Sequence, residues 1–599
     1  MLGKLFNWFD DRTGYRALMH DALYENIPGG SRWRYVWGST LVFTFTIQVI
    51  TGLVLWMAYS PSENTAWESV NYIQYEMQGG WLLRGIHHFT AQAMVVLLVI
   101  HLAQVVIDGA YKAPREVNFW IGLILMQIVL GLSLTGYLLP WDQKGYWATR
   151  VATNLMSLVP VVGVKLQQLV VGGNDYNHHT VTRFFALHAG VLPILLVGFL
   201  VAHVAVFRRQ GICAKPSKRK DQTFWPEQIL KDGVACLAVL AAVIFLSVYL
   251  GAESSAPADG AREYSAARPE WYFLFLFQFL KWFEGMGAFG EFLGAIAIPG
   301  FFMAMLFAMP FFGRFKAGHV FNVVLLFVLL GGAGYLTYEA IEEDLANPDL
   351  QNDVWIAHES AGLSVELAGQ GIPVEGARHM MRTNPKSLAL RTFTDTCLTC
   401  HAYNDGAGHG FAMEKATAPN LYGFSTEKWI SALLDPKQVD GPHFFGGTGM
   451  KEGDMVGFVK ESRQKDDGGE IAIDDKAAGQ IAAALAAEAG AEVDPEVLRQ
   501  GRALIEKTCI DCHKFHDEGY LGSAPDLTGY GSREWLIGMI GNPSHERFYG
   551  HLEDEQAMPA FGQVKDNPLA ENLDPKVIGY LADYLRGELF EHQTGARAK

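Results

Sequence analysis

The chain has 599 residues, so its length predicts several domains. Half of the residues are hydrophobic and only 18% are charged, which excludes a disordered protein and is too apolar for a wholly water-soluble one. The formal net charge of −16 argues against a nucleic-acid partner, and six cysteines are too few for a disulfide scaffold.

Charge and hydropathy divide the chain into two parts. Residues 341–599 hold 23 Lys and Arg against 42 Asp and Glu, whereas residues 1–340 have a small positive excess and nearly all of the apolar runs. We therefore expect a membrane domain followed by an acidic, water-soluble domain.

Seven apolar runs are long enough to cross the hydrocarbon core, which takes about 20 residues in a helix. They cover roughly residues 37–59, 83–107, 118–139, 184–206, 233–250, 288–311 and 319–338. The charged, amphipathic stretch before the first run has no small-residue cleavage site, so we interpret it as a retained anchor and not as a cleaved signal peptide.

Loop charges predict the orientation of this bundle. The loops after the second, fourth and sixth runs share one side and carry a series of cations: Lys112, Arg115, Arg208, Arg209, Lys215, Lys218, Arg219, Lys220, Arg314 and Lys316. The positive-inside rule places that side in the cytoplasm. We expect a multi-pass protein of the bacterial cytoplasmic (inner) membrane, with its N-terminus inside and its acidic half outside.

Two of the runs contain paired histidines. His87 and His101 are 14 residues apart, and His188 and His203 are 15 apart. Either spacing puts both rings on roughly one face of a helix, about 21–22 Å apart along its axis. Core histidines that only form hydrogen bonds are the plainer alternative, but ionisable residues in spans are rare and usually functional. Two such helices facing each other predict two stacked b-type haems with bis-histidine ligation, and we do not expect His88 to be a ligand.

Glycines repeat with a similar spacing. Gly38 and Gly52 in the first run, and Gly122 and Gly136 in the third, are each 14 residues apart. Glycine lets a bulky planar group approach the backbone, so this weaker signal agrees with the haem prediction.

Four motifs make the first 340 residues resemble cytochrome b of quinol:cytochrome c oxidoreductases. They are Arg84-Gly-Ile-His87, Gly136-Tyr-Leu-Leu-Pro-Trp141-Asp-Gln143, Thr182-Arg183-Phe-Phe-Ala-Leu-His188 and Pro269-Glu270-Trp271-Tyr272. The 15-residue histidine spacing and Arg209-Gln-Gly211 are closer to the chloroplast type and its menaquinol relatives. The resemblance implies a haem-binding four-helix part over 1–215 and a subunit IV-like three-helix part over 216–340.

The resemblance also assigns site residues. It implies a quinol-oxidising site on the outer side, with Glu270 as proton acceptor and with Tyr272 and Tyr146 lining the same pocket near Trp141. It implies an inner quinone site near Lys231 and Asp232, for which a solvated helix-capping pair is an equal alternative. Arg84 and Arg183 lie near the outer haem ligands and are candidates to pair with haem propionates or to position helix ends.

The sequence departs from the chloroplast type at one point. That type attaches an extra haem through a single Cys at the start of its first span, whereas residues 33–38 here contain no cysteine. We expect no covalent haem in this half, and we interpret Cys213 and Cys236 as structural.

The acidic half contains two C-x-x-C-H motifs, the attachment signature of c-type haem. The first comprises Cys397, Cys400 and His401, and the second comprises Cys509, Cys512 and His513. A zinc site would need four clustered ligands, and a redox C-x-x-C would need a thioredoxin-like αβ pattern that is missing here. Two covalent c haems, each with a proximal histidine, are therefore predicted outside the membrane.

The two motifs belong to an internal repeat. Ala418-Pro-Asn-Leu421 with Trp429 corresponds to Ala524-Pro-Asp-Leu527 with Trp535. This predicts two cytochrome c-like domains, over 391–490 and 491–599, after a linker or cap over 341–390. The complete expected fold is thus all-α: a seven-span transmembrane bundle with two C-terminal cytochrome c-like domains.

A methionine is the usual sixth ligand of a c haem. Ala557-Met558-Pro559 selects Met558 in the second copy. In the first copy Met455 aligns best, Met450 is the alternative, and Met413 is too close to the motif. Core packing is the plain alternative role for any single methionine.

The resemblance and the motifs together favour a cytochrome b subunit fused to a dihaem cytochrome c. Such a protein passes one electron from quinol, more weakly favoured as menaquinol, to a Rieske iron–sulfur protein and the other through the b haems to quinone inside, moving protons outward. The chain has no Rieske-type cluster motif, so that protein must be a separate partner. A soluble cytochrome c or a terminal oxidase is the expected acceptor, and the family implies a homodimer. The alternatives are a non-bifurcating membrane haem anchor between quinone and a periplasmic redox partner, and a haem-based sensor.

Overall fold

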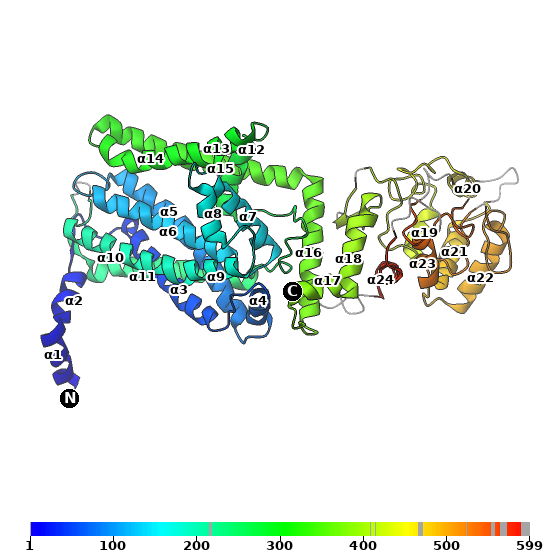
Figure 1. The fold of residues 1–599 in the computed structure, drawn as a ribbon, viewed down its shortest axis with the longest axis horizontal. Coiled ribbons are helices and arrows are strands. Elements are labelled where there is room, and N and C mark those ends of the chain that lie inside the picture. Colours follow the sequence, from blue (N-terminus) through cyan, green and yellow to red (C-terminus); the bar gives the residue numbers. More distant parts are fainter. Residues whose placement is uncertain are drawn as a thin grey trace. The chain divides into compact units, whose positions relative to one another are not determined.

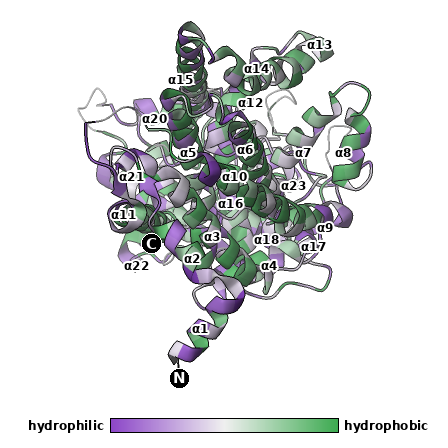
Figure 2. Ribbon diagram, turned by 90° about the vertical axis from the view of Figure 1, so that its left-hand side faces the viewer, coloured by the Kyte–Doolittle hydropathy of each residue, from purple (hydrophilic) through white to green (hydrophobic). Residues whose placement is uncertain are grey.

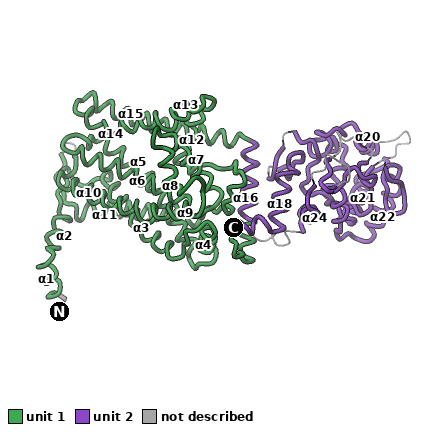
Figure 3. The backbone as a smooth tube through the Cα atoms, viewed as in Figure 1, with its two compact units in different colours: residues 1–347, 364–378 green, residues 348–363, 379–599 purple. Residues whose placement is uncertain are grey.

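The computed structural model describes residues 2–214, 218–407, 409–413, 415–464, 471–522, 524–550, 552, 558–563 and 572–588. Lys215 of the cationic loop, Ala557 beside Met558 and the end of the second predicted c domain, 589–599, lie outside the described residues. The chain is mostly helical and divides into two compact units, residues 1–347 with 364–378 and residues 348–363 with 379–599 (Figure 3).

Unit 1 holds seven helices that are long and apolar enough to cross a membrane, counted over the described residues. They are α3 (Trp37–Trp56), α5 (Gly80–Asp108), α6 (Glu116–Tyr137), α9–η2–α10 (His178–Gln210), η3–α11 (Phe224–Tyr249), α13–η5–α14 (Gly287–Phe312) and α15 (Lys316–Ala346). Apolar residues dominate along α5, α6, α10 and α14 in Figure 2. All seven predicted runs are confirmed as such helices, and most extend a few residues further than predicted because their ends are polar.

Shorter elements of unit 1 connect these helices. They are α1 (Leu2–Thr13), α2 (Tyr15–Leu23), β1 (Asn26–Ile27), η1 (Trp33–Tyr35), α4 (Ala66–Tyr75), α7 (Gln143–Ser157), α8 (Gly163–Val171), β2 (Gln222–Thr223), η4 (Trp271–Phe273) and α12 (Leu274–Lys281). The strands β1 and β2 pair antiparallel, with Asn26 opposite Thr223. Helix α5 packs against α3 and α11, and α6 packs against α10 (Figure 1).

Unit 2 is a set of short helices. They are α18 (Pro385–Thr396), η6 (Cys397–Thr399), α19 (Glu427–Leu433), α20 (Asp454–Glu461), α21 (Asp475–Glu488), α22 (Pro495–Thr508), α23 (Arg533–Gly541) and α24 (Pro575–Leu585), with the strand pair β3 (Tyr403–Asn404) and β4 (Gly410–Phe411). The two helices α16 (Pro348–Ala368) and α17 (Ala377–Thr383) contribute residues to both units.

Three helices of unit 2 begin in the same way. Asn384, Asp494 and Asp574 each accept a backbone N–H in the first turn, and each is followed by proline at the first helical position. Both features stabilise a helix start, because the cap satisfies free N–H groups and proline has none to satisfy. The repeated starts agree with the predicted internal repeat.

The region predicted as a linker or cap is helical, and the predicted boundary between the two c-type domains falls in a turn between two helices. Residues 341–390 are largely helical, and Asn352 in α16 exchanges two hydrogen bonds with the backbone of Ala412, at 2.6 and 2.9 Å. The seam predicted between residues 490 and 491 lies between α21 and α22, which pack against each other within one compact unit.

Candidate haem sites and outer cavity

The four predicted ligand histidines lie on two helical segments of unit 1. His87 and His101 belong to α5, His188 lies in the π-helical turn η2 (Leu187–Val191), and His203 belongs to α10. In η2 the N–H of Leu192 donates to the carbonyl of Leu187, five residues back. Such a turn accommodates one extra residue, so the 15-residue spacing of this helix keeps the register of the 14-residue spacing in α5.

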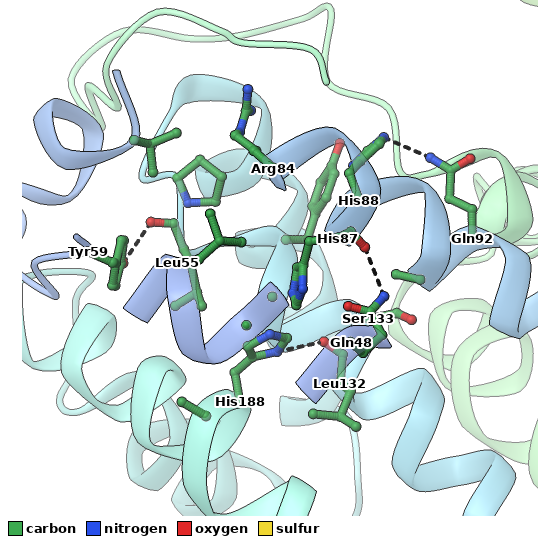
Figure 4. Close-up of a pocket in the computed structure, with 18 of the residues that line it drawn as sticks. Gln48, Leu55, Tyr59, Arg84, His87, His88, Gln92, Leu132, Ser133 and His188 are labelled. Atoms are coloured by element: carbon green, nitrogen blue, oxygen red, sulfur yellow. Dashed lines mark hydrogen bonds between the residues drawn. The ribbon is translucent and has the colours of Figure 1, made fainter. Parts of the chain in front are cut away.

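The outer pair faces a shared space. The ring centroids of His87 and His188 are 6.2 Å apart, and both rings line one cavity of about 350 Å³ (Figure 4). Metal–imidazole bonds are about 2.0–2.1 Å long, so one metal atom held between two imidazoles separates their ring centres by about 6 Å. The spacing of the pair therefore fits an iron atom between the two rings.

Hydrogen bonds orient three of the four rings. Nδ1 of His87 lies 2.9 Å from the hydroxyl of Thr51, and Nδ1 of His188 lies 3.0 Å from the carbonyl oxygen of Leu132. Nδ1 of His203 lies 3.1 Å from the carbonyl oxygen of Asn118. Each contact occupies Nδ1 and leaves Nε2 for a metal, as in other histidine-ligated metal sites. Nδ1 of His101 is buried without a hydrogen-bond partner in the described residues.

Each histidine is opposed by one of the predicted glycines. A Cβ atom at Gly136 would lie 2.6 Å from Cε1 of His188, and one at Gly52 would lie 3.3 Å from Cε1 of His87. At the inner pair, Gly122 stands against His203 at 3.3 Å and Gly38 against His101 at 3.8 Å. The glycines thus leave room for the imidazoles, and the donor set and the space around it fit two haem b groups.

The outer cavity extends from the histidine pair to the Pro-Glu-Trp-Tyr motif. Glu270 and Tyr272 line it, together with Lys144 and Glu253. Burial raises the pKa of Glu270, while the Lys144 ammonium lowers it and the Glu253 carboxylate raises it further. Burial likewise raises the pKa of the Tyr272 phenol. A carboxyl group with a raised pKa in an apolar cavity can accept and release a proton near neutral pH.

Polar contacts connect this motif to the second span. The indole of Trp271 donates to Oε1 of Gln92 at 3.2 Å, and Nε2 of His88 lies 2.8 Å from Nε2 of Gln92 (Figure 4). Lys144 forms an ion pair with Glu253 at 2.5 Å. Lys144, Glu253 and Gln92 were not predicted, because they lie in three segments that are distant in the sequence and none of them belongs to a quoted motif.

Tyr146 does not line this cavity, contrary to the sequence prediction. Its ring is 5% exposed and packs at 5.5 Å from Trp141 in a core that also contains Phe184. Its hydroxyl is covered at Gly260, where a Cβ atom would lie only 2.4 Å away. The first turn of α7 directs Tyr146 into the core, whereas Lys144 reaches the cavity.

The two predicted arginines have different surroundings. Arg84 lines the cavity and donates to the side chains of Gln74 and Ser254 and to the carbonyl oxygen of Glu253. Arg183 does not line it and donates to the carbonyl oxygen of Leu169 at the end of α8. The contact of Arg183 corresponds to the helix-positioning alternative.

Lys231 and Asp232 lie near the start of α11. Lys231 donates to the hydroxyl of Ser31 at 2.5 Å, and Asp232 accepts from the side chain of Gln228 at 2.8 Å. Gln228 in turn accepts the N–H of Arg32 at 2.9 Å. Asp232 is buried, so the pair is not the solvated cap of the alternative interpretation.

The two C-x-x-C-H histidines have identical settings in unit 2. Nδ1 of His401 contacts the carbonyl of Pro419 and Nδ1 of His513 that of Pro525, both at 2.7 Å. Burial lowers the pKa of both imidazoles, which keeps them neutral, as a metal ligand must be. Among the described residues no cluster of three or more His, Cys, Asp or Glu side chains is suited to a metal ion.

One tryptophan in each repeat forms an equivalent hydrogen bond. The indole of Trp429 donates to the carbonyl of Asn420 at 2.9 Å, and the indole of Trp535 donates to that of Asp526 at 2.8 Å. The second half of the repeat therefore reproduces these two hydrogen bonds of the first, and the thiols and the Nε2 atoms fit covalent haem c.

A membrane bundle with facing histidine pairs and an attached C-x-x-C-H unit is the architecture of a membrane cytochrome. The chain belongs to the cytochrome b/b6 family: residues 25–211 match the family model described as Cytochrome b/b6/petB. Residues 496–573 match the model described as Cytochrome C oxidase, cbb3-type, subunit III. The protein thus combines a haem b-binding domain with a c-type cytochrome domain.

Known relatives support this membership. The chain is 38% identical over 220 residues to the menaquinol:cytochrome c reductase cytochrome b subunit of Geobacillus thermodenitrificans, and equally to that of Bacillus subtilis (strain 168). It is 39% identical over 211 residues to cytochrome b6 of Synechococcus sp. (strain JA-3-3Ab). Each match covers 35% of this chain and 98% of the relative.

One solved structure is also similar. It is titled Hyperthermophilic respiratory Complex III, with 24% identity, a TM-score of 0.47, and coverage of 56% of this chain and 97% of that chain. At this TM-score the similarity supports no conclusion about function.

Replacing Gly136 by Ala should remove the outer b haem. The added Cβ would lie 2.6 Å from the His188 ring and must displace it. We expect pyridine haemochrome spectra of the purified chain to show about half of the wild-type haem b and unchanged haem c. Gly198→Ala in α10, where a Cβ has nothing within 4 Å, is the matched control. Full haem b in Gly136→Ala would contradict the assignment.

Proposed function

We propose that this chain is the cytochrome b subunit of a menaquinol:cytochrome c reductase, fused to its own dihaem cytochrome c. The observation that carries the proposal is the outer cavity, in which the histidine pair and Glu270 with Tyr272 share one space. A quinol held there is next to both a redox centre and a proton acceptor.

The chain offers ligands for four haems. His87 with His188 holds the outer haem b, and His101 with His203 holds the inner one. Two haems c would be attached at the C-x-x-C-H motifs, with His401, His513, Met455 and Met558 as the residues that would hold their iron atoms. When bound, the haems accept and pass on single electrons.

Glu270 receives a proton from quinol in this proposal. Its side chain is half-buried, and burial raises its pKa, so it can hold the proton for a time instead of losing it at once. The Lys144–Glu253 ion pair lines the same cavity, and the Glu253 side chain is 71% exposed. This pair is therefore a polar path from Glu270 toward water.

The remaining assignments complete the reaction. One electron from quinol goes to a separate Rieske iron–sulfur protein and the other to the b haems, with quinone reduction inside near Lys231 and Asp232, so that protons move outward. The N-terminus lies in the cytoplasm and the c-type haems lie outside the bacterial inner membrane. The subunit forms a homodimer, and a soluble cytochrome c or terminal oxidase accepts electrons from the c haems.

Replacing Glu270 by Gln should slow quinol oxidation about 10²-fold or more, the usual contribution of a positioned proton acceptor. All four haems should stay bound, as checked by haem spectra. Glu263→Gln, an exposed glutamate of the same loop, is the matched control and should retain wild-type turnover. Unchanged turnover in Glu270→Gln would exclude Glu270 as the acceptor.

The same site predicts a pH dependence. Only the carboxylate form of Glu270 accepts a proton, and burial raises its pKa, so that form is lost as the pH falls through a range above that of an ordinary glutamate. Wild-type turnover should therefore rise with pH across that range. In Glu270→Gln this titration should disappear from the pH profile of quinol oxidation.

Dependence on a Rieske protein separates the proposal from the membrane-anchor alternative. In membranes depleted of that protein, quinol should reduce neither the c haems nor, when inner-site reduction is blocked, the b haems. Restoring the Rieske protein should restore both reactions together. Rapid reduction of the c haems without it would favour the simple anchor.

A further inference from the structure

In unit 2, helices of each c-type repeat pack against helices of the other repeat. Each repeat has a helix before its C-x-x-C-H motif, α18 or α22, and a helix at its end, α21 or α24. In unit 2, α22 packs on α21 and α18 packs on α24 (Figure 1). Within the described part of the chain, neither α18 with α21 nor α22 with α24 makes an extended contact. The motif helix of each repeat is thus held by the end helix of the other.

The α21–α22 crossing is close and buried. A Cβ atom at Gly501 would lie 2.1 Å from the carbonyl oxygen of Gln480 and 2.7 Å from Cβ of Ala484, so the two backbones are in direct contact. Ile505, one turn further along α22, is fully buried in the same core. Helix α22 ends at Thr508, so the residue that follows this packed helix is Cys509.

The α18–α24 crossing is its counterpart. Ala389 and Phe393 lie eight and four residues before Cys397, as Gly501 and Ile505 do before Cys509. Both are fully buried, and the ring of Phe393 lies 5.0 Å from that of Tyr584 in α24. Equivalent positions of the two repeats therefore make equivalent contacts, each with the other repeat.

These helix pairs belong to two bodies within unit 2, and the chain segments that connect the two bodies lie at one place. The rings of Phe424 and Tyr530 are 5.6 Å apart, and a Cβ atom at Gly531 would lie 2.3 Å from Cβ of Ser425. Ser425 and Gly531 both have positive φ, 61° and 73°. One body is consequently contiguous, over 425–530, and it is inserted into the other, formed by 385–424 and 531–588.

The buried core of the inserted body contains one attachment site and one candidate methionine. Helices α19, α20 and α21 share this core with Phe515 and Leu527, and both Cys509 and Met455 pack against it. Figure 2 shows α20, α21 and α22 together, apart from α18 and α23. Met455 of the first repeat thus lies with the haem site of the second.

Met558 lies with the other body. It is three residues from Phe561, whose N–H donates to the carbonyl of Ile540 in α23 at 3.1 Å and whose carbonyl accepts from Leu573 at 2.7 Å, just before α24. Helix α24 packs against α18, which ends at Thr396, directly before Cys397. Hydrogen bonds also join the two bodies near residues 424 and 531. Asn420 contacts His443 at 3.0 Å, the Trp429 indole donates to Asn420, and the Trp535 indole donates to Asp526.

We infer that axial ligation is crossed between the repeats: Met455 completes the haem site of Cys509, Cys512 and His513, and Met558 completes that of Cys397, Cys400 and His401. This rests on the proposed pair of c haems and replaces the pairing within each repeat that the sequence alone predicts. Neither repeat contains a complete haem site, so the dihaem unit folds as one body.

The test uses the full chain with one attachment site removed. Cys509→Ser/Cys512→Ser leaves only the first c haem, and Cys397→Ser/Cys400→Ser leaves only the second. Ferric haem with a methionine ligand has a sulfur-to-iron charge-transfer band at the far-red edge of the visible spectrum, which the bis-histidine b haems lack. In the first background, Met558→Ala should abolish this band and Met455→Ala should leave it unchanged. In the second background the two effects should be reversed.

Loss of the band with Met455→Ala or Met450→Ala in the first background, or with Met558→Ala in the second, would overturn crossed ligation. Met455→His and Met558→His serve where an alanine variant fails to fold, because each should convert only the crossed haem to a lower-potential bis-histidine form.

Haem staining of denatured protein distinguishes failure of the proposed pair of c haems from failure of the crossed ligation. If the single-site chains retain no covalent haem, the pair of c haems is wrong; if they retain one and the band follows the same repeat, only the crossing is wrong.

Discussion

The distance between facing imidazoles is the constraint on which unit 1 depends. Two rings with centroids 6.2 Å apart leave room for one metal atom. Four glycines oppose the four histidines, and at Gly136 even a Cβ atom would displace the ring of His188. The helices that carry these residues can pack in few other ways. Because helices in a bilayer gain little from the hydrophobic effect, close contacts such as those at the glycines contribute to holding them together.

The outer cavity follows from this arrangement. It is bounded by the outer histidine pair, by the start of α7 and by the loops on either side of residue 260, which bring Lys144, Glu253 and Glu270 to one wall. The outer histidine pair and Glu270, the redox site and the proton acceptor of the proposed function, therefore line one largely apolar cavity. Such proximity allows electron transfer to be coupled to proton release, because either step without the other leaves an unstable charge.

The sequence predicted much of this site but not all of it. His87, Glu270 and Tyr272 were found because their motifs are compact and their chemistry restricts residue type. Tyr146 was misplaced because position in the chain does not reveal which side of a short helix turns to a cavity. Lys144 and Glu253 were missed since an ion pair between distant segments leaves no local pattern.

The sequence by itself determined the seven apolar helices, the histidine spacings, the two haem-attachment motifs and the repeat, because periodicity and local chemistry set these features. Tertiary structure decided the rest. The π-helical turn at His188 compensates for the difference between the 14-residue and the 15-residue histidine spacing. This turn packs against α6. Which of two similar helices pairs with which is likewise decided only by the packed core, since both repeats carry nearly the same contact surfaces and either pairing satisfies them locally.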